Sequence, residues 1–290
     1  MPISVVKKVR MNKKEICIVI PIYKETLDSF EIQSVEQCVK VLSDYTIHFV
    51  CPKELNIDFY KENFSGIVDF TYFENYYFKD LAGYNRLMLS VGFYKAFDKY
   101  KYMLVHQTDS YVFRDELLDW ARKGYDYIGG VWFEEYHGDP RLGAKLWYPG
   151  NGGFSLRNLD KIIRILSSRS PLKGLKKIVE EKQMNLKKER NIFFRSIIEI
   201  PFMLLGYKNC FNYFAKMNIA NEDVFFMEAS LIYNKLNVPV VEQAVSFSWD
   251  RSPEFLFDKL GYLPFGCHAW YREDHCYKEN KMFWSNHIFK

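Results

Sequence analysis

The stretch EICIVIPI, residues 15–22, indicates a buried β-strand, because it is a continuous apolar run, rich in β-branched residues and closed by a turn. Other runs of this kind occur at residues 46–50, 67–73, 102–106 and 125–128. Between them we expect helices, at residues 34–42, 80–99 and 117–123. Strands that alternate with helices predict a largely parallel sheet covered on both faces, which is an α/β fold.

A basic segment interrupts this pattern. Residues 157–195 hold 12 Lys and Arg against four Asp and Glu, and an apolar run follows at 192–205. We expect one domain, residues 1–290, with a basic helical insertion at 160–220. The insertion predicts either a solvated helical surface or contact of residues 160–205 with an anionic membrane surface or a lipid-linked acceptor.

Composition argues against several classes of function. The net charge of +4 is too small to indicate nucleic-acid binding, so no nucleic acid is expected as a partner. The six cysteines contain no C-x-x-C pair, so neither a zinc ribbon nor a disulfide scaffold is predicted. The apolar run at 16–22 is far too short to export the chain or span a bilayer. We therefore expect a cytoplasmic protein, or one that is peripheral at the inner face of the membrane.

Sheets of this kind bind ligands at the carboxyl ends of their strands. There the motif HQTDSY (106–111) places Asp109 just after the strand at 102–106. A carboxylate in that position can hold a divalent metal ion against a diphosphate, or it can cap the following helix. On this motif alone, both interpretations of Asp109 stay open.

Three later motifs also carry candidate residues. GNGGFSLR (150–157) has three glycines in four positions, which indicates either a tight turn or a backbone that a ligand approaches closely. NEDVFF (221–226) puts paired acids before an apolar helix, where they match the helix dipole or supply a general base. LPFGCHAW (263–270) places His268 in a Pro/Gly turn, where a structural role is the alternative to a ligand role.

Together, and in this order, these motifs resemble those of GT-A glycosyltransferases. The whole series is similar to a bacterial and eukaryotic family, assumed to be glycosyltransferases, that was long filed as a domain of unknown function. The resemblance covers most of the chain except residues 160–220. Its segments are IVIPIYKE (18–25), GYNRLMLSVGFYKAF (83–97), YMLVHQTDSYVFRDEL (102–117), GYDYIGGVW (124–132), GNGGFSLRN (150–158), NEDVFF (221–226) and LPFGCHAW (263–270).

The resemblance implies a GT-A-like, Rossmann-like mixed sheet and a nucleotide-sugar donor, for which a UDP-sugar is the first expectation. The residues it assigns to the donor nucleotide are Pro21, Tyr23, Glu25, Asn85, Asp109 and Ser110. Those it assigns to the sugar and the acceptor are Trp132, Asn151, Gly152, Gly153, Phe154 and Trp270. It further implies that Asp109 and His268 hold a Mn²⁺ or Mg²⁺ ion. Asp223, with Glu222, would supply the catalytic base of an inverting enzyme.

One position departs from the GT-A pattern, whose Asp-x-Asp signature has Tyr111 here in place of the second aspartate. Dependence on a metal ion is therefore open, because cationic side chains can neutralise the leaving diphosphate instead. We expect transfer of a sugar to a hydroxyl of a glycan or glycoconjugate. The alternatives are a non-catalytic carbohydrate- or nucleotide-binding module and a metal-dependent phosphohydrolase or nucleotidyltransferase.

Overall fold

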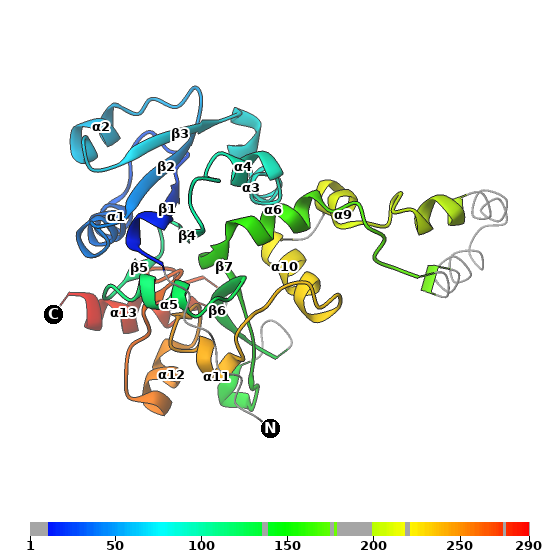
Figure 1. Ribbon diagram of the computed structural model, residues 1–290. Helices are drawn as coiled ribbons and strands as arrows, with labels where there is room; N and C mark the ends of the chain where they lie inside the picture. The colour runs from blue at the N-terminus through cyan, green and yellow to red at the C-terminus, as the bar shows by residue number, and fades with distance from the viewer. Residues whose placement is uncertain are drawn as a thin grey trace.

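A nine-stranded sheet in the order β3-β2-β1-β4-β7-β6-β8-β9-β5 forms the centre of the molecule (Figure 1). The computed structural model describes residues 11–134, 139–174, 177–178, 199–217, 221–274 and 277–289. The strands are β1 (Ile16–Pro21), β2 (Thr46–Pro52), β3 (Asp69–Phe73), β4 (Tyr102–His106), β5 (Tyr111–Val112), β6 (Tyr127–Phe133), β7 (Leu146–Asn158), β8 (Ser248–Trp249) and β9 (Gly266–Cys267).

The first half of the sheet is parallel, as the sequence predicts. Ile18 of β1 lies beside Ile47 of β2 on one side and Leu104 of β4 on the other, and β3 adds in parallel to β2. The long strand β7 then runs antiparallel to both β4 and β6, while β6, β8 and β9 pair in parallel. The expected α/β fold with a mixed, mostly parallel sheet is confirmed.

Helices cover both faces of the sheet, and alternation along β1 shows why. Ile16, Ile18 and Ile20 pack into one hydrophobic cluster, whereas Cys17 and Val19 pack into another, because successive side chains of a strand point to opposite faces. Helices on the first face are α1 (Ser29–Val41), α2 (Asp58–Phe64), α5 (Leu117–Arg122), α11 (Val241–Ala244), α12 (Pro253–Leu260) and α13 (Asn280–Ile288). Those on the second are α3 (Leu81–Met88), α4 (Val91–Lys95), α6 (Leu159–Ser167), α9 (Phe211–Met217) and α10 (Glu222–Leu231).

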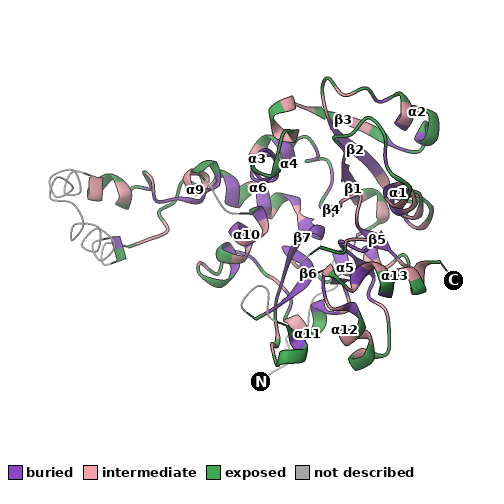
Figure 2. Cartoon of the chain, turned by 180° about the vertical axis from the view of Figure 1, so that it is seen from behind, coloured by how far each residue is buried: buried purple, intermediate pink, exposed green. Residues whose placement is uncertain are grey.

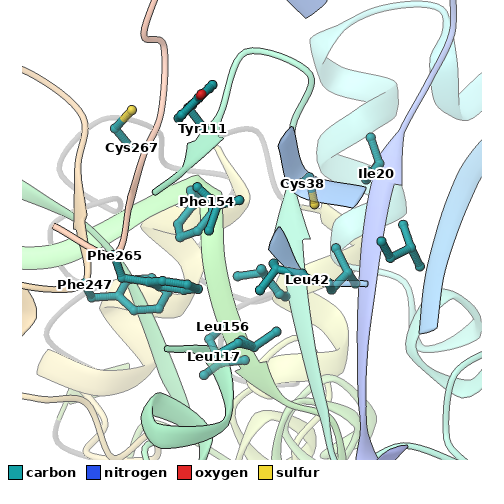
Figure 3. Packing of buried hydrophobic residues seen from close by; sticks show 14 of the residues in the cluster. Ile20, Cys38, Leu42, Tyr111, Leu117, Phe154, Leu156, Phe247, Phe265 and Cys267 are labelled. Carbon is teal, nitrogen blue, oxygen red and sulfur yellow. The ribbon is translucent and has the colours of Figure 1, made fainter. Parts of the chain in front are cut away.

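Burial follows this layering. Figure 2 shows the strands at the centre as buried, while the helices carry one buried and one exposed side. Figure 3 shows part of the first cluster, where Phe154, Phe247 and Phe265 pack together below Tyr111 and Cys267. The structure also contains the short 3₁₀ helices η1 (Lys13–Glu15), η2 (Asn75–Phe78) and η3 (Pro140–Leu142).

The structure corrects the sequence at one expected helix and excludes a turn at two motifs. The single helix expected at 80–99 is broken into α3 and α4, because the Ser90 hydroxyl accepts a hydrogen bond from the Phe93 amide and starts a new helix. The glycines of GNGGFSLR do not form a turn but lie inside strand β7. His268 likewise follows directly after strand β9, not within a turn.

The basic insertion is described only in part. Residues 175–176, 179–198 and 218–220 lie outside the described residues, so nearly half of the expected membrane contact at 160–205 does too. The described residues 199–204 are helical and belong to a segment that projects away from the sheet between α6 and α9 (Figure 1). Within the described parts of the chain, no helix is both long and apolar enough to cross a bilayer.

Candidate functional site

Two adjoining cavities lie where strands β1 and β4 end. One has a volume of about 430 Å³ and is lined by residues that follow β1, by η2 and by Tyr271. The other, of about 280 Å³, is lined by α3, β7, the start of α10 and residues that follow β8 and β9. Both are lined by Leu81, Tyr84, Gln107 and Asp109, so Asp109 stands at the border between them.

The larger cavity has a polar wall built around Glu31, which is buried. The carboxylate of Glu31 accepts hydrogen bonds from the Lys24 ammonium at 2.9 Å and from the Thr108 hydroxyl at 2.9 Å. Tyr23 lines the same cavity with most of its ring exposed. A lysine, a hydroxyl and an open aromatic face are suited to a ligand that combines a ring with an anionic group.

A His–Asp cluster stands between the cavities. The Nδ1 atom of His268 lies 2.7 Å from an Asp250 carboxylate oxygen. The Nε2 atom lies 3.0 Å from Oε1 of Gln107 and 3.3 Å from Oδ1 of Asp109. His268 is buried, so two carboxylates and one amide oxygen surround an imidazole that is largely withdrawn from water.

These contacts decide the charge of the cluster. Burial favours the neutral imidazole, but Asp109 and Asp250 outweigh it and raise the pKa of His268 to about 10. Burial likewise opposes ionisation of Asp109, but the positive His268 prevails and lowers the pKa of Asp109. At neutral pH the cluster is therefore an imidazolium between two carboxylates.

The first turn of α10 brings a second pair of acids to the smaller cavity. Asn85 of α3 holds this helix start, since its Oδ1 accepts the Glu222 amide at 3.0 Å and its amide group donates to Asn221. Glu222 is buried and accepts a hydrogen bond from the guanidinium of Arg157 at 2.9 Å. Asp223, the next residue, accepts from the Val224 amide and lines the cavity.

Asp223 is poised to exchange protons near neutral pH. Its burial, followed by repulsion from the neighbouring Glu222, raises the pKa of Asp223 to about 7. A general base works best when its pKa lies near the operating pH, because it is then ionised and still basic. Asp223, half-buried at the cavity, therefore has the pKa of a carboxylate that takes a proton from a bound group.

The glycines of β7 are required because these side chains come so close. A Cβ atom at Gly152 would lie 2.3 Å from Oε1 of Glu222, and one at Gly153 would lie 2.2 Å from the His268 ring. Neither glycine has a positive φ, so conformational freedom is not the reason for either. The groups that come close to these glycines in the structure are protein side chains, so the approach of a ligand to this motif stays a prediction.

Cationic groups face the smaller cavity as well. Arg251 and Arg272 line it together with the charged His268. Arg272 donates to Asp274 at 2.8 Å and lies over the Tyr277 ring, 4.5 Å from its centroid, so its guanidinium is held in place. Three positive groups beside Asp109 can bind an anion such as a diphosphate.

Most of the residues predicted from the sequence line these cavities. The larger one is lined by Pro21, Tyr23 and Asp109, and the smaller one by Asn85, Asp109, Trp132, Asn151, Gly152, Gly153, Glu222, Asp223 and His268. Asn85, which was predicted to bind the nucleotide, lines the smaller cavity and holds the start of α10 there.

Four predicted residues line neither cavity. Phe154 is fully buried among Phe247 and Phe265, and Trp270 is fully buried with its indole N–H on the Ser34 hydroxyl. Both are core residues because their large rings face into the first cluster. Ser110 is buried and donates to the Gly153 carbonyl, and Glu25 is exposed outside the cavities.

Several residues of the site were not predicted from the sequence: Tyr84, Gln107, Arg157, Asp250, Arg251, Arg272 and Tyr277. Asp250 and Arg251 follow VSFSW (245–249), whose alternation of apolar and polar residues is typical of a strand, and strand ends are where ligand-binding residues lie. That signal could have identified them. Arg157 carries no such signal, because nothing local predicts that a strand arginine will reach the start of α10.

A divalent cation bound with a diphosphate fits these residues only in place of the Nε2 proton of His268, because a metal-ligating imidazole is neutral. Asp250 orients His268 through Nδ1, as carboxylates commonly do for metal-ligating histidines, so that Nε2 faces the Asp109 carboxylate. Among the described residues, no group of three or more His, Cys, Asp and Glu is arranged to hold a metal ion. A cation held by Asp109 and His268 would therefore take its other ligands from the diphosphate and from water.

Comparisons with known proteins identify a family. A model of the family described as "Protein of unknown function (DUF5672)" matches residues 67–268. No curated protein matches the chain.

Two solved structures are distantly similar to the chain. The apo-form glycosyltransferase GlyE of Streptococcus pneumoniae has 13% identity and a TM-score of 0.44 over 94% of this chain, which spans 60% of that structure's length. The 4-diphosphocytidyl-2C-methyl-D-erythritol synthase of Anaerococcus prevotii has 13% identity and a TM-score of 0.34, over 54% of this chain and 77% of the other. These TM-scores are too low for either likeness to carry a function.

Proposed function

Since the chain belongs to the DUF5672 family, whose description assigns no activity, we propose a function from the geometry of the site. The protein is a glycosyltransferase that moves a sugar from a nucleotide-diphosphate sugar to a hydroxyl of a glycan or glycoconjugate acceptor. It inverts the anomeric centre and uses Asp223 as the general base. The sheet would then be a GT-A-like catalytic core.

The observation that carries this proposal is the position and pKa of Asp223. A carboxylate whose pKa is about 7 lines the same cavity as Asp109, His268 and Arg272. Transfer of a sugar to a hydroxyl needs both the carboxylate and the positive groups. A base must accept the hydroxyl proton, and positive groups must stabilise the leaving diphosphate.

The donor spans the two cavities in this proposal. The nucleoside occupies the larger cavity beside Pro21 and Tyr23, where a base can stack on the exposed ring. The diphosphate lies at the border, near His268 and Arg272, and the sugar enters the smaller cavity beside Gly152 and Trp132. A UDP-sugar is the donor we propose first.

The residues divide the chemistry between them. The acceptor oxygen forms a bond to the anomeric carbon as the bond to the diphosphate oxygen breaks, and the hydroxyl proton passes to Asp223. His268 and Arg272 bind the negative charge that develops on the diphosphate. If a Mn²⁺ or Mg²⁺ ion were held by Asp109 and His268, it would replace the Nε2 proton of His268 and supply the positive charge there in place of the imidazolium. Glu222 touches the cavity but acts on Asp223 by charge.

The acceptor and the place of action are part of the same proposal. A lipid-linked acceptor at the inner membrane face suits the segment that projects from the sheet. Its described part exposes Phe202, Leu205 and Tyr207 beside Lys208. Apolar rings next to a lysine are suited to the interface of an anionic bilayer.

A panel of UDP-, GDP-, CDP- and ADP-sugars tests the function. The purified protein should release one nucleoside diphosphate, and release should rise when acceptor glycans are added. Release of inorganic phosphate from nucleotides without a sugar would instead favour a phosphohydrolase. Binding of sugars or nucleotides without any release, with every donor and acceptor, would favour a binding module.

A further inference from the structure

A third cavity, of about 520 Å³, lies apart from the candidate site and has cations as its only charged lining residues. It is lined by residues of η2, α3 and α4 and by residues of α6 and α9. Figure 1 shows helices α3, α4 and α6 next to one another. Its charged side chains are Arg86, Arg169 and Lys216, all of them exposed. Within the described parts of the chain, none of the three forms an ion pair with an acid. Three cations without a counter-charge indicate a site for an anion.

One wall of this cavity is aromatic and rigid. The rings of Tyr76 and Tyr77 lie with centroids 4.2 Å apart, and nearly half of Tyr76 is exposed. Their segment packs tightly on α3, since a Cβ atom at Gly83 would lie only 2.6 Å from the Tyr76 carbonyl oxygen. The Asp80 carboxylate fixes the same start of α3 by accepting the Gly83 amide. An aromatic face held in place beside cations suits the ring of a saccharide that carries a charge.

The cavity is separate from the candidate active site but adjoins it. Helix α3 turns Leu81, Tyr84 and Asn85 toward the candidate site, whereas Arg86 and Leu89 line the third cavity. Tyr77 lines both the third cavity and the larger cavity of the candidate site. None of the residues proposed to act in sugar transfer lines the third cavity.

We propose that this cavity is a second ligand site, which binds a phosphate-bearing saccharide. Arg86, Arg169 and Lys216 bind the phosphate, and the Tyr76–Tyr77 wall packs against the sugar ring. Ser167 and Asn212 also line the cavity and offer polar groups for hydroxyls. The site does not depend on the reaction proposed above. A phosphorylated glycan can come free in solution or as the headgroup of a lipid.

Calorimetry with glucose 6-phosphate as the probe tests the site. We expect saturable binding to the full-length protein and binding weaker by about tenfold or more in the variant Arg86→Ala/Arg169→Ala/Lys216→Ala, because charge-assisted hydrogen bonds are lost. The matched control is Lys40→Ala/Lys61→Ala/Lys95→Ala, which removes the same charge from other exposed positions. Equal weakening in both variants, or no binding to the unmodified protein, would overturn the proposal.

Further probes separate the saccharide from its phosphate. Tyr76→Ala should weaken glucose 6-phosphate several-fold and leave inorganic phosphate unchanged. Phosphate that binds as tightly as glucose 6-phosphate would contradict a saccharide site. Vesicles of phosphatidylcholine with phosphatidylglycerol distinguish the lipid source. If the protein binds these vesicles but not glucose 6-phosphate, and the triple variant Arg86→Ala/Arg169→Ala/Lys216→Ala loses the vesicles, the cavity is a lipid contact instead.

UDP binding to the triple variant tests whether the third cavity is independent of the candidate site. Loss of UDP binding in this variant would overturn that independence.

Discussion

Arg157 of β7 and Glu222 of α10 form an ion pair whose two side chains are both buried, with Nη2 of the arginine 2.9 Å from Oε1 of the glutamate. The guanidinium also donates to the Tyr94 hydroxyl at 2.8 Å. The pair fastens the helix that carries Asp223 to the centre of the sheet. It also leaves a carboxylate beside Asp223, which adds to the larger effect of burial in raising the pKa of Asp223.

Replacing Asp223 by Asn should lower turnover by roughly 10²–10⁴, because the amide cannot accept the acceptor proton. Donor binding should change little, since the substitution keeps the size of the side chain. Turnover with saturating donor and a separate donor Kd measure the two effects. Glu228→Gln, on the exposed side of the same helix, is the control. Unchanged turnover in Asp223→Asn would remove Asp223 from the mechanism.

The pH dependence of kcat/KM should report Asp223 directly. A base must be ionised to act, so activity should rise with pH with a midpoint near the pKa of about 7 and fall below it. Glu222→Gln removes the repulsion that raises this pKa, so the midpoint should move to lower pH. A midpoint that stays in place in Glu222→Gln would contradict the assignment.

The stability of the fold should also decrease as Asp223 becomes ionised. Its pKa rises from an ordinary value of 3.8 to about 7 on folding, so the folded state binds the proton more tightly. The free energy of unfolding should therefore fall as the pH rises from about 4 to about 7. Asp223→Asn should lessen that fall and be more stable than the unmodified protein at pH 8. Urea unfolding at several pH values measures the free energy of unfolding of both proteins. The same dependence of this free energy on pH in both would refute the prediction.

Breaking the buried ion pair should be costly. Arg157→Met leaves Glu222 buried and uncompensated, which should destabilise the fold by about 3–5 kcal/mol. The double variant Arg157→Met/Glu222→Leu removes both charges and should recover much of that loss. Denaturant unfolding of both single variants and the double variant gives the coupling. Additive effects would mean that the two side chains do not interact.

Gly153→Ala should disrupt the site and leave the fold largely intact. The added methyl group would lie 2.2 Å from the His268 ring, so the imidazole must move from Asp109 and Asp250. Donor binding and turnover should both fall by at least about tenfold, because small displacements of catalytic groups are costly. Gly174→Ala is the control, since its methyl group meets no atom within 4 Å. Equal activity in the two variants would show that His268 does not act in the site.

Nucleotide binding tests the role of Asp109. UDP at ~100 times its Kd should stabilise the protein by ~2.7 kcal/mol, and we expect a larger shift of Tm with Mn²⁺ present. Asp109→Asn should abolish the extra shift due to Mn²⁺, while Asp119→Asn, an exposed aspartate of α5, should retain it. A Mn²⁺ effect that persists in Asp109→Asn would place the ion elsewhere.

The sequence alone determined the parallel half of the sheet and the strand end that carries Asp109. Apolar runs and helical spacing are local signals, and the covered faces of a parallel sheet follow from them. The break between α3 and α4 was missed because Ser90 competes with a helical pattern that continues on both sides. The sequence could not exclude a turn at the glycines of β7, because their strand conformation depends on pairing with β4 and β6.

Only the tertiary structure decided which polar groups share the cavities. Asp109 and His268 are 159 positions apart in the sequence, and Arg157 reaches Glu222 across 65 positions. No local pattern encodes these distances, because the pairing of β5 with β9 and the packing of α10 on β7 create them. The same packing placed Phe154 and Trp270 in the core, since a large ring is drawn to whichever space the folded chain closes off from water.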